Sequence, residues 1–142
     1  MTINLLSQDN KQIKIINSDK TFANIKIHPD YWRLIGNVNF SHNNILMKCD
    51  SAYHFINENK INAFGNISIN QGDSIVLTGK KLNYSGTKNI ANILENVNFE
   101  DNYMKLETDE ISYNLNSKIA SYPKSGNISD NNKIIMSKQG LY

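Results

Sequence analysis

The chain has 142 residues, a formal net charge of +2 and 39% hydrophobic residues. This length is enough to bury a core without help from a metal or a disulfide, and the small, evenly spread charge argues against nucleic acid as a partner. The single cysteine, Cys49, cannot form an internal disulfide, so it leaves the redox compartment undetermined.

The N-terminal segment, residues 1–22, lacks the basic start and apolar run of a signal peptide, and no segment approaches the roughly 20 apolar residues that span a bilayer. A secreted protein would therefore need a signal upstream of this chain. Ile16, Ser18, Asp19 and Ala23 match the second half of a repeat whose first half is missing. Residues 28–30, His-Pro-Asp, interrupt the pattern and are expected to form a loop, because proline cannot donate to a strand ladder.

A repeat of about 30 residues organises the rest of the chain. Asn37, Asn66, Asn96 and Asn127 each precede a β-branched residue, and they stand 29, 30 and 31 residues apart. We expect one domain over residues 1–142. Its units are a partial repeat at 11–30, full repeats at about 31–60, 61–90 and 91–120, and a partial repeat at 121–142.

Each full repeat predicts two antiparallel strands with a bend. Apolar residues alternate with polar ones through the first half, and a polar turn follows. In the second half the apolar row shifts by one position at a corner, where Asp50, Lys80, Asp109 and Lys138 are equivalent. A strand cannot change the face of its apolar row without a bulge or bend, so we expect one at each corner. The fold class is therefore all-β, and no helix is predicted.

The sequence offers weak candidates for catalytic or metal-binding residues. Asp50 and Asp109 resemble paired carboxylates, but lysines occupy the equivalent corners, so we expect solvated corners instead of an acid–base pair. His28, His42 and His54 have spacings that fit no metal site.

Two of these side chains have simpler interpretations. His54 stands where the other repeats have Tyr84 and Tyr113, which predicts a packed or rim aromatic. Cys49 fills a small-residue position next to the corner and is expected to be a buried, inert thiol. We predict no enzyme activity, cofactor or metal.

The order of motifs at this period resembles the OstA-like family of lipopolysaccharide-transport proteins, which includes LptA-like proteins, in its Bacteroidetes-type form. The resemblance is carried by CDSAY at residues 49–53, AFGNISINQGD at 63–73 and LTG at 77–79, and it covers roughly residues 16–142. Two features depart from the family pattern: Lys80 and Lys138 stand where the family often has Asp, and Glu95 replaces the repeated Gly.

The resemblance implies an open, V-shaped β-jellyroll, also called a β-taco, in the periplasm. Its inner surface would hold the acyl chains of lipopolysaccharide, each buried methylene gaining about 0.8 kcal/mol. Lysines at the rim would meet the phosphates of the head group. The expected groove-lining residues are Val38, Phe40, Met47, Ile61, Ala63, Ile67, Ile69, Leu77, Leu82, Ile93, Val97, Phe99, Leu106, Ile111, Ile128 and Ile135.

The terminal strands, residues 11–22 and 133–142, would pair with other jellyroll components or with further copies of the chain, forming part of a bridge to the outer membrane. The alternative from the residues alone is a non-catalytic β-solenoid or sandwich with a closed, filled core, used as a scaffold or surface module.

Overall fold

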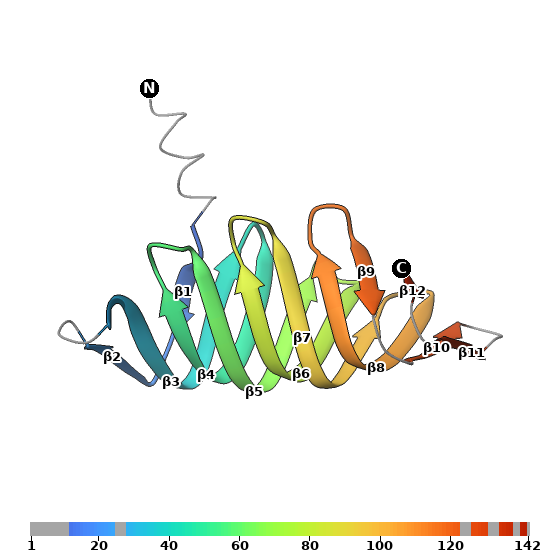
Figure 1. The fold of residues 1–142 in the computed structure, drawn as a ribbon, viewed down its shortest axis with the longest axis horizontal. Coiled ribbons are helices and arrows are strands. Elements are labelled where there is room, and N and C mark those ends of the chain that lie inside the picture. Colours follow the sequence, from blue (N-terminus) through green and yellow to red (C-terminus); the bar gives the residue numbers. More distant parts are fainter. Residues whose placement is uncertain (1–11, 25–27, 123–125, 131–133, 138–139, 142) are drawn as a thin grey trace, which may run out of the picture.

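The computed structural model describes residues 12–24, 28–122, 126–130, 134–137 and 140–141 (Figure 1). Its twelve strands form one antiparallel sheet, and the described residues contain no helix, which confirms the all-β prediction. Accordingly, the described part of the chain offers no helix of the length and apolar character needed to cross a membrane.

Bent strands follow one another along the long axis of the molecule (Figure 1). The central order is β1-β3-β4-β5-β6-β7-β8-β10-β11, while β2 pairs with β3, and β9 pairs with β8 and β12. Neighbours from β3 to β8 are consecutive in sequence, so each hairpin adds to the last. The strands are β1 (Lys14–Asn17), β2 (Lys20–Asn24), β3 (His28–His42), β4 (Ile45–Phe55), β5 (Lys60–Gln71), β6 (Ile75–Ser85), β7 (Ile90–Glu100), β8 (Met104–Asn114), β9 (Ile119–Tyr122), β10 (Gly126–Asp130), β11 (Ile134–Ser137) and β12 (Gly140–Leu141).

A line of bulges folds this sheet into a V. Between β5 and β6, for example, Phe64 pairs with Lys81 and Ile67 pairs with Gly79, so that two residues oppose one. The same irregularity occurs between every pair of neighbours from β3 to β8. The corners predicted from the sequence are therefore bulges.

Left-handed backbone forms each bulge on alternate strands. Gly65 and Asn66 have φ values of +81° and +47°, and Gly36 and Asn37 have +84° and +46°. Glycine and asparagine tolerate this region best, which explains the repeated Gly-Asn pair. At the third bulge Glu95 adopts φ +67° in place of glycine.

The carboxylates of Asp19 and Asp50 stabilise two of these bulges, a role that the sequence did not reveal. Asn66 Nδ2 donates to Asp50 Oδ2 at 2.9 Å, and Asn37 Nδ2 donates to Asp19 Oδ2 at 2.9 Å. Asp19 thus makes the same contact with Asn37 that Asp50 makes with Asn66. Where Lys80 replaces the Asp, Glu95 forms a salt bridge of 3.2 Å with Lys81 instead.

The bulge line divides the sheet into two halves. Half A runs from the bulges to the turns at 43–44, 72–74 and 101–103, and half B runs from the bulges to the turns at 56–59, 86–89 and 115–118. Alternate side chains of both halves point into the V and are buried, as in a strand with one face on a core.

The expected loop at residues 28–30 is wrong, because β3 begins at His28. Pairing with β2 is irregular there: Asn24 pairs with His28, whereas Ala23 pairs with Trp32. Pro29 thus lies in a stretch without a partner on β2, where its missing N–H costs no ladder bond.

Both ends of the sheet finish in short strands. β1 and β2 both pair with β3 at one end, and β11 pairs with β10 and β12 with β9 at the other; no second neighbour is described for any of the four strands. The outer edges of β1, β2, β11 and β12 are therefore the edges that the described sheet leaves unpaired.

Candidate functional site

The expected groove-lining residues come together on the inner face of the V. Fourteen of the sixteen are within the described core, and each has an exposure of 2% or less. Ile128 and Ile135 pair with each other, and Ile128 also pairs with Leu106, but their side chains are outside the described residues. The buried fourteen are Val38, Phe40, Met47, Ile61, Ala63, Ile67, Ile69, Leu77, Leu82, Ile93, Val97, Phe99, Leu106 and Ile111.

In this state the two halves pack against each other. The Phe99 ring on half A lies 5.6 Å from the Tyr113 ring on half B, measured between centroids. Side chains such as Ile69 and Ile93 have no exposed surface. The interior is therefore a filled apolar core, and a ligand would enter it only if the halves moved apart.

Polar contacts join the halves along the rim, the side of the V opposite the bulges. His42 Nδ1 and the Tyr84 hydroxyl hydrogen-bond, and Tyr113 donates its hydroxyl to Gln71 Oε1 at 2.8 Å. His42 and Gln71 are 29 residues apart, and so are the two tyrosines, so one contact is repeated in successive units. Gln71 Nε2 also donates to the Leu115 carbonyl at 2.9 Å.

Burial keeps these phenols protonated. Burial, with the nearby Asp101 charge as a smaller contribution, raises the pKa of Tyr113 to about 12. Burial alone raises the pKa of Tyr84 above its usual value. Both hydroxyls therefore remain hydrogen-bond donors at neutral pH.

A second repeated contact lies in the turns of the rim. The backbone N–H of Gly86 donates to the Asn59 carbonyl at 2.8 Å, and that of Leu115 donates to the Asn89 carbonyl at 2.9 Å. Side chains add to this, since Asn43 Nδ2 donates to Asn89 Oδ1 at 2.9 Å. The two backbone bonds join neighbouring turns within half B, whereas the bond of Asn43 to Asn89 crosses to half A. We call the hydrogen bonds that cross between the halves the rim contacts; they are His42–Tyr84, Tyr113–Gln71, Gln71–Leu115 and Asn43–Asn89. Separating the halves requires breaking these hydrogen bonds and exposing the apolar core.

The other candidate residues take structural positions. Cys49 is buried, and burial together with the adjacent Asp50 charge raises its pKa to about 12, which suppresses the thiolate. His54 is 9% exposed, as the packed-aromatic interpretation predicts, and burial lowers its pKa. Asp50 and Asp109 lie on β4 and β8, which three other strands separate.

Among the residues that the structure describes, no group of three or more His, Cys, Asp or Glu side chains is placed to hold a metal ion.

The rim contacts are what the sequence analysis missed. The tyrosine row was visible at its 29-residue spacing, but its partners were not, because His42 and Gln71 are different residue types at the polar ends of their strands. The one feature of the sequence that could have indicated the pairing is the 29-residue spacing of His42 and Gln71, which equals that of the two tyrosines.

Comparisons with known proteins agree with this architecture. The chain matches the family of OstA-like proteins over residues 10–142. Its structure is similar to a crystal structure of LptH, described as the LptA homologous periplasmic component of the conserved lipopolysaccharide transport device from Pseudomonas aeruginosa. The TM-score is 0.70 at 16% identity, over 93% of this chain and 99% of that one.

No curated protein matches the chain in a sequence search. The identity to LptH is low enough that this likeness speaks for the fold, whereas the family match spans nearly the whole sequence. The V-shaped jellyroll and the repeated bulges expected from the motifs are both present. The chain belongs to the OstA-like protein family.

Proposed function

We propose that this chain is a non-enzymatic periplasmic lipopolysaccharide-transport protein, which shields the acyl chains of the lipid between the two halves of its sheet. The observation that carries the proposal is the continuous apolar inner face, which runs across β3 to β8 and ends at a rim held by side-chain and turn contacts. Family membership and the likeness to LptH support it.

The energetics favour acyl chains as the ligand. The inner face consists of aliphatic and aromatic side chains, and each methylene removed from water gains about 0.8 kcal/mol. A polar hydrogen bond in the rim is worth about 1 kcal/mol net. A chain of a dozen carbons therefore offsets the loss of several rim contacts, which makes a closed resting state compatible with lipid uptake.

Transfer of the lipid from one protein to the next would use the edges of the sheet. We infer that the edge strands β1 and β2 at one end, and β11 and β12 at the other, pair with other jellyroll components or with further copies, so that the apolar faces become continuous. Main-chain hydrogen bonds would carry this association. Phe22 on β2 is 53% exposed and would be covered by such a neighbour.

A photo-crosslinking experiment tests the lipid site. A benzophenone amino acid is placed at Ile69, which points inward, or at its neighbour Ser68, which points to the other face, and radiolabelled lipopolysaccharide is added. We expect lipid adducts from position 69 and few from position 68. Equal labelling at the two positions, with both variants folded, would remove the proposal.

Sedimentation tests the edge contact separately. Phe22→Lys places a charge on the edge strand and should reduce self-association or association with a partner jellyroll. Tyr103→Lys is the control, since Tyr103 is 74% exposed in a turn away from the edges. If both variants associate like the wild type, stacking through β2 is wrong.

The second candidate is a closed scaffold module without lipid. The full burial of the inner side chains in this state favours it. It predicts no crosslinking to lipopolysaccharide from any inner position and unchanged thermal stability when the lipid is added.

A further inference from the structure

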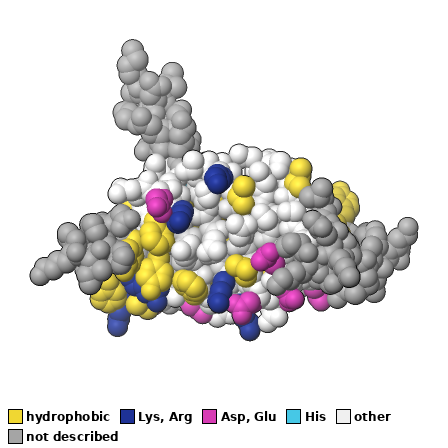
Figure 2. All heavy atoms as spheres, viewed as in Figure 1, with side chains coloured by type: hydrophobic (Ala, Val, Ile, Leu, Met, Phe, Trp, Pro, Cys, Tyr) yellow, Lys and Arg dark blue, Asp and Glu magenta, His cyan; other side chains and the backbone are white. Residues whose placement is uncertain are grey.

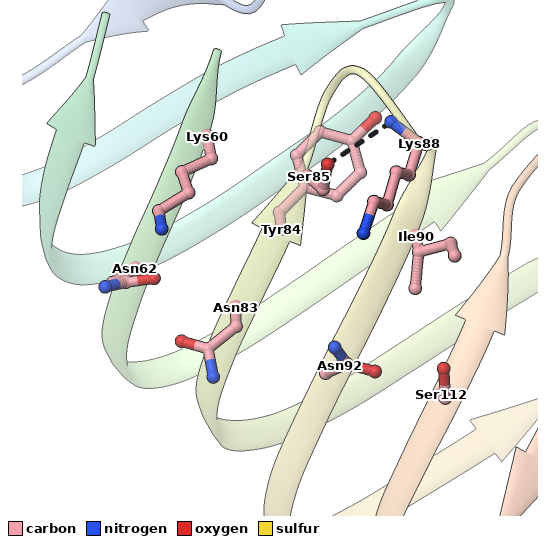
Figure 3. A pocket seen from close by; sticks show the side chains of 9 residues that line it. All are labelled: Lys60, Asn62, Asn83, Tyr84, Ser85, Lys88, Ile90, Asn92 and Ser112. Carbon is pink, nitrogen blue, oxygen red and sulfur yellow. Dashed lines mark hydrogen bonds between the residues drawn. The ribbon is translucent and has the colours of Figure 1, made fainter. Parts of the chain in front are cut away.

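A row of amide and hydroxyl side chains crosses the outer face of half B. Asn62, Asn83, Asn92 and Ser112 stand directly opposite one another on β5, β6, β7 and β8. Figure 3 shows the four side chains one after another across these strands. Neighbouring strands are about 4.8 Å apart, so polar groups repeat at that interval.

These side chains have no hydrogen-bond partners within the described part of the chain, and Asn83 and Asn92 are exposed. Each amide presents two donors and one acceptor, and each hydroxyl presents one donor and an acceptor. A ligand rich in hydroxyl groups has the complementary pattern. Carbohydrate is therefore the chemical class that suits a ladder of this kind.

The row lies in a hollow of about 600 Å³ that extends to the rim, and the charged residues among its described lining are Lys60 and Lys88. In Figure 3 both ammonium groups lie on the same side of the hollow, above the amide row. Lys60 also contacts Glu58 at 3.3 Å, but both side chains are about half exposed, so this pair is weak. The hollow is thus suited to a saccharide that carries phosphate.

Aromatic and guanidinium groups extend the row beyond β5. Asn62 pairs with Tyr53, and Tyr53 pairs with Arg33 on β3. The Arg33 guanidinium carbon lies 4.4 Å from the centre of the Tyr53 ring, and its Nη1 is buried without a hydrogen-bond partner among the described residues. A planar guanidinium is suited to phosphate, and the unpartnered Nη1 of Arg33 would have to become accessible to bind one. Hydrophobic side chains gather at the β3–β5 end of the molecule in Figure 2, while its centre is largely polar.

The outer face of half A provides a contrast. A second hollow there is lined by Glu107 and Asp109 beside Asn96 and Asn98, so it would repel a phosphorylated ligand. Of these two amide-bearing hollows in the described part of the chain, the one on half B carries the charge that suits an anionic saccharide.

We propose that the outer face of half B is a binding site for a phosphorylated oligosaccharide, with Asn62, Asn83 and Asn92 as the main hydrogen-bonding residues. Lys60 and Lys88 would meet the phosphates. The inference builds on the proposed function: a lipid whose acyl chains lie inside the V would pass its saccharide over the rim at the turn that carries Lys88. The site deepens that function by assigning a position to the head group.

The test uses a probe without acyl chains, namely fully deacylated lipopolysaccharide oligosaccharide, with its phosphates present or enzymatically removed. Binding is measured by calorimetry and by NMR of the asparagine side-chain amides. We expect Asn92→Leu to weaken binding about fivefold, and Asn83→Leu with Asn92→Leu about 20-fold. Asn98→Leu on the same strand β7, but on half A, is the matched control and should leave binding unchanged.

A second pair of variants tests the lysines. Lys60→Gln with Lys88→Gln should weaken binding of the phosphorylated probe and leave that of the dephosphorylated probe nearly unchanged, while Lys48→Gln on half A serves as the control. Intact lipopolysaccharide is measured alongside. It should bind more tightly than the deacylated probe, and the variants should weaken its binding by the same factors.

Three outcomes would overturn the inference. The first is that neither probe binds. The second is that the probe binds equally well to the variants Asn83→Leu and Asn92→Leu. The third is that inorganic phosphate alone displaces the probe fully, which would indicate simple anion attraction. Because the probe lacks acyl chains, its failure leaves crosslinking from Ile69 unaffected. Conversely, probe binding without such crosslinking would support the saccharide site and contradict the acyl site.

Discussion

The bend and the rim close the same V by different means. At the bend the backbone itself turns, through left-handed Gly-Asn pairs that the carboxylates of Asp19 and Asp50 stabilise. At the rim the chain does not continue from one half to the other, and hydrogen bonds such as that of Tyr113 with Gln71 join them. The bend therefore acts as a fixed crease, whereas non-covalent contacts alone hold the halves together at the rim.

The largest expected effect is at the bend. A Cβ added to Gly65, whose φ is +81°, would lie 2.5 Å from Asp50 Oδ2, so Gly65→Val combines backbone strain with a clash and should cost about 3 kcal/mol in unfolding free energy. Urea denaturation measures it. Gly72 in a rim-side turn is the matched control, because its φ of +64° is also left-handed but no atom lies within 4 Å of an added Cβ.

Gly72→Val should cost about 1 kcal/mol, from backbone strain alone. Equal losses for the two glycine variants would show that the contact with Asp50 contributes nothing to the crease.

A smaller effect is expected for the corner carboxylate. Asp50→Ala leaves Asn66 without its partner and should lower the unfolding free energy by about 1.5 kcal/mol. At the equivalent position Lys80 is exposed and makes no hydrogen bond or salt bridge within the described residues, so Lys80→Ala should change stability by less than about 0.5 kcal/mol. Similar losses of unfolding free energy for the two variants would show that Asp50 is a solvated corner residue without a stabilising role, as the sequence predicts.

At the rim, Tyr113→Phe removes one link between the halves and should lower stability by about 1 kcal/mol. The same change should increase lipid crosslinking from Ile69, because the halves separate more readily. Tyr103→Phe, in an exposed turn, controls for loss of a hydroxyl. A loss of stability without a gain in crosslinking would mean that lipid does not enter through the rim.

The smallest effect concerns pH. Burial lowers the pKa of His54 below its value in the unfolded chain, so the unfolded state takes up a proton first as the pH falls. Stability from this group is complete above about pH 6.5 and declines as the pH falls from there toward the folded-state pKa. His54→Tyr, which copies Tyr84, should flatten that decline in thermal melts between pH 7 and pH 5. An unchanged slope would exclude His54 as its source.

The crease was predictable from the sequence, and the rim was not. A repeated Gly-Asn pair and a one-residue shift of the apolar row are local consequences of backbone geometry, so they appear in the sequence at every repeat. The burial of Phe99 and Ile69 followed from the same alternation. Rim contacts join residues 42 to 46 positions apart through different residue types, so no local pattern encodes them. The amide row on half B depends on strand register, which the sequence leaves open until the bulges are counted.

Each rim link skips a strand pair, since the end of β3 reaches β6 and the end of β5 reaches β8. The spans of the two links therefore overlap at β5 and β6. If a lipid enters between the halves, as proposed, breaking one link would free strands that the next link also spans, and opening would proceed stepwise along the protein.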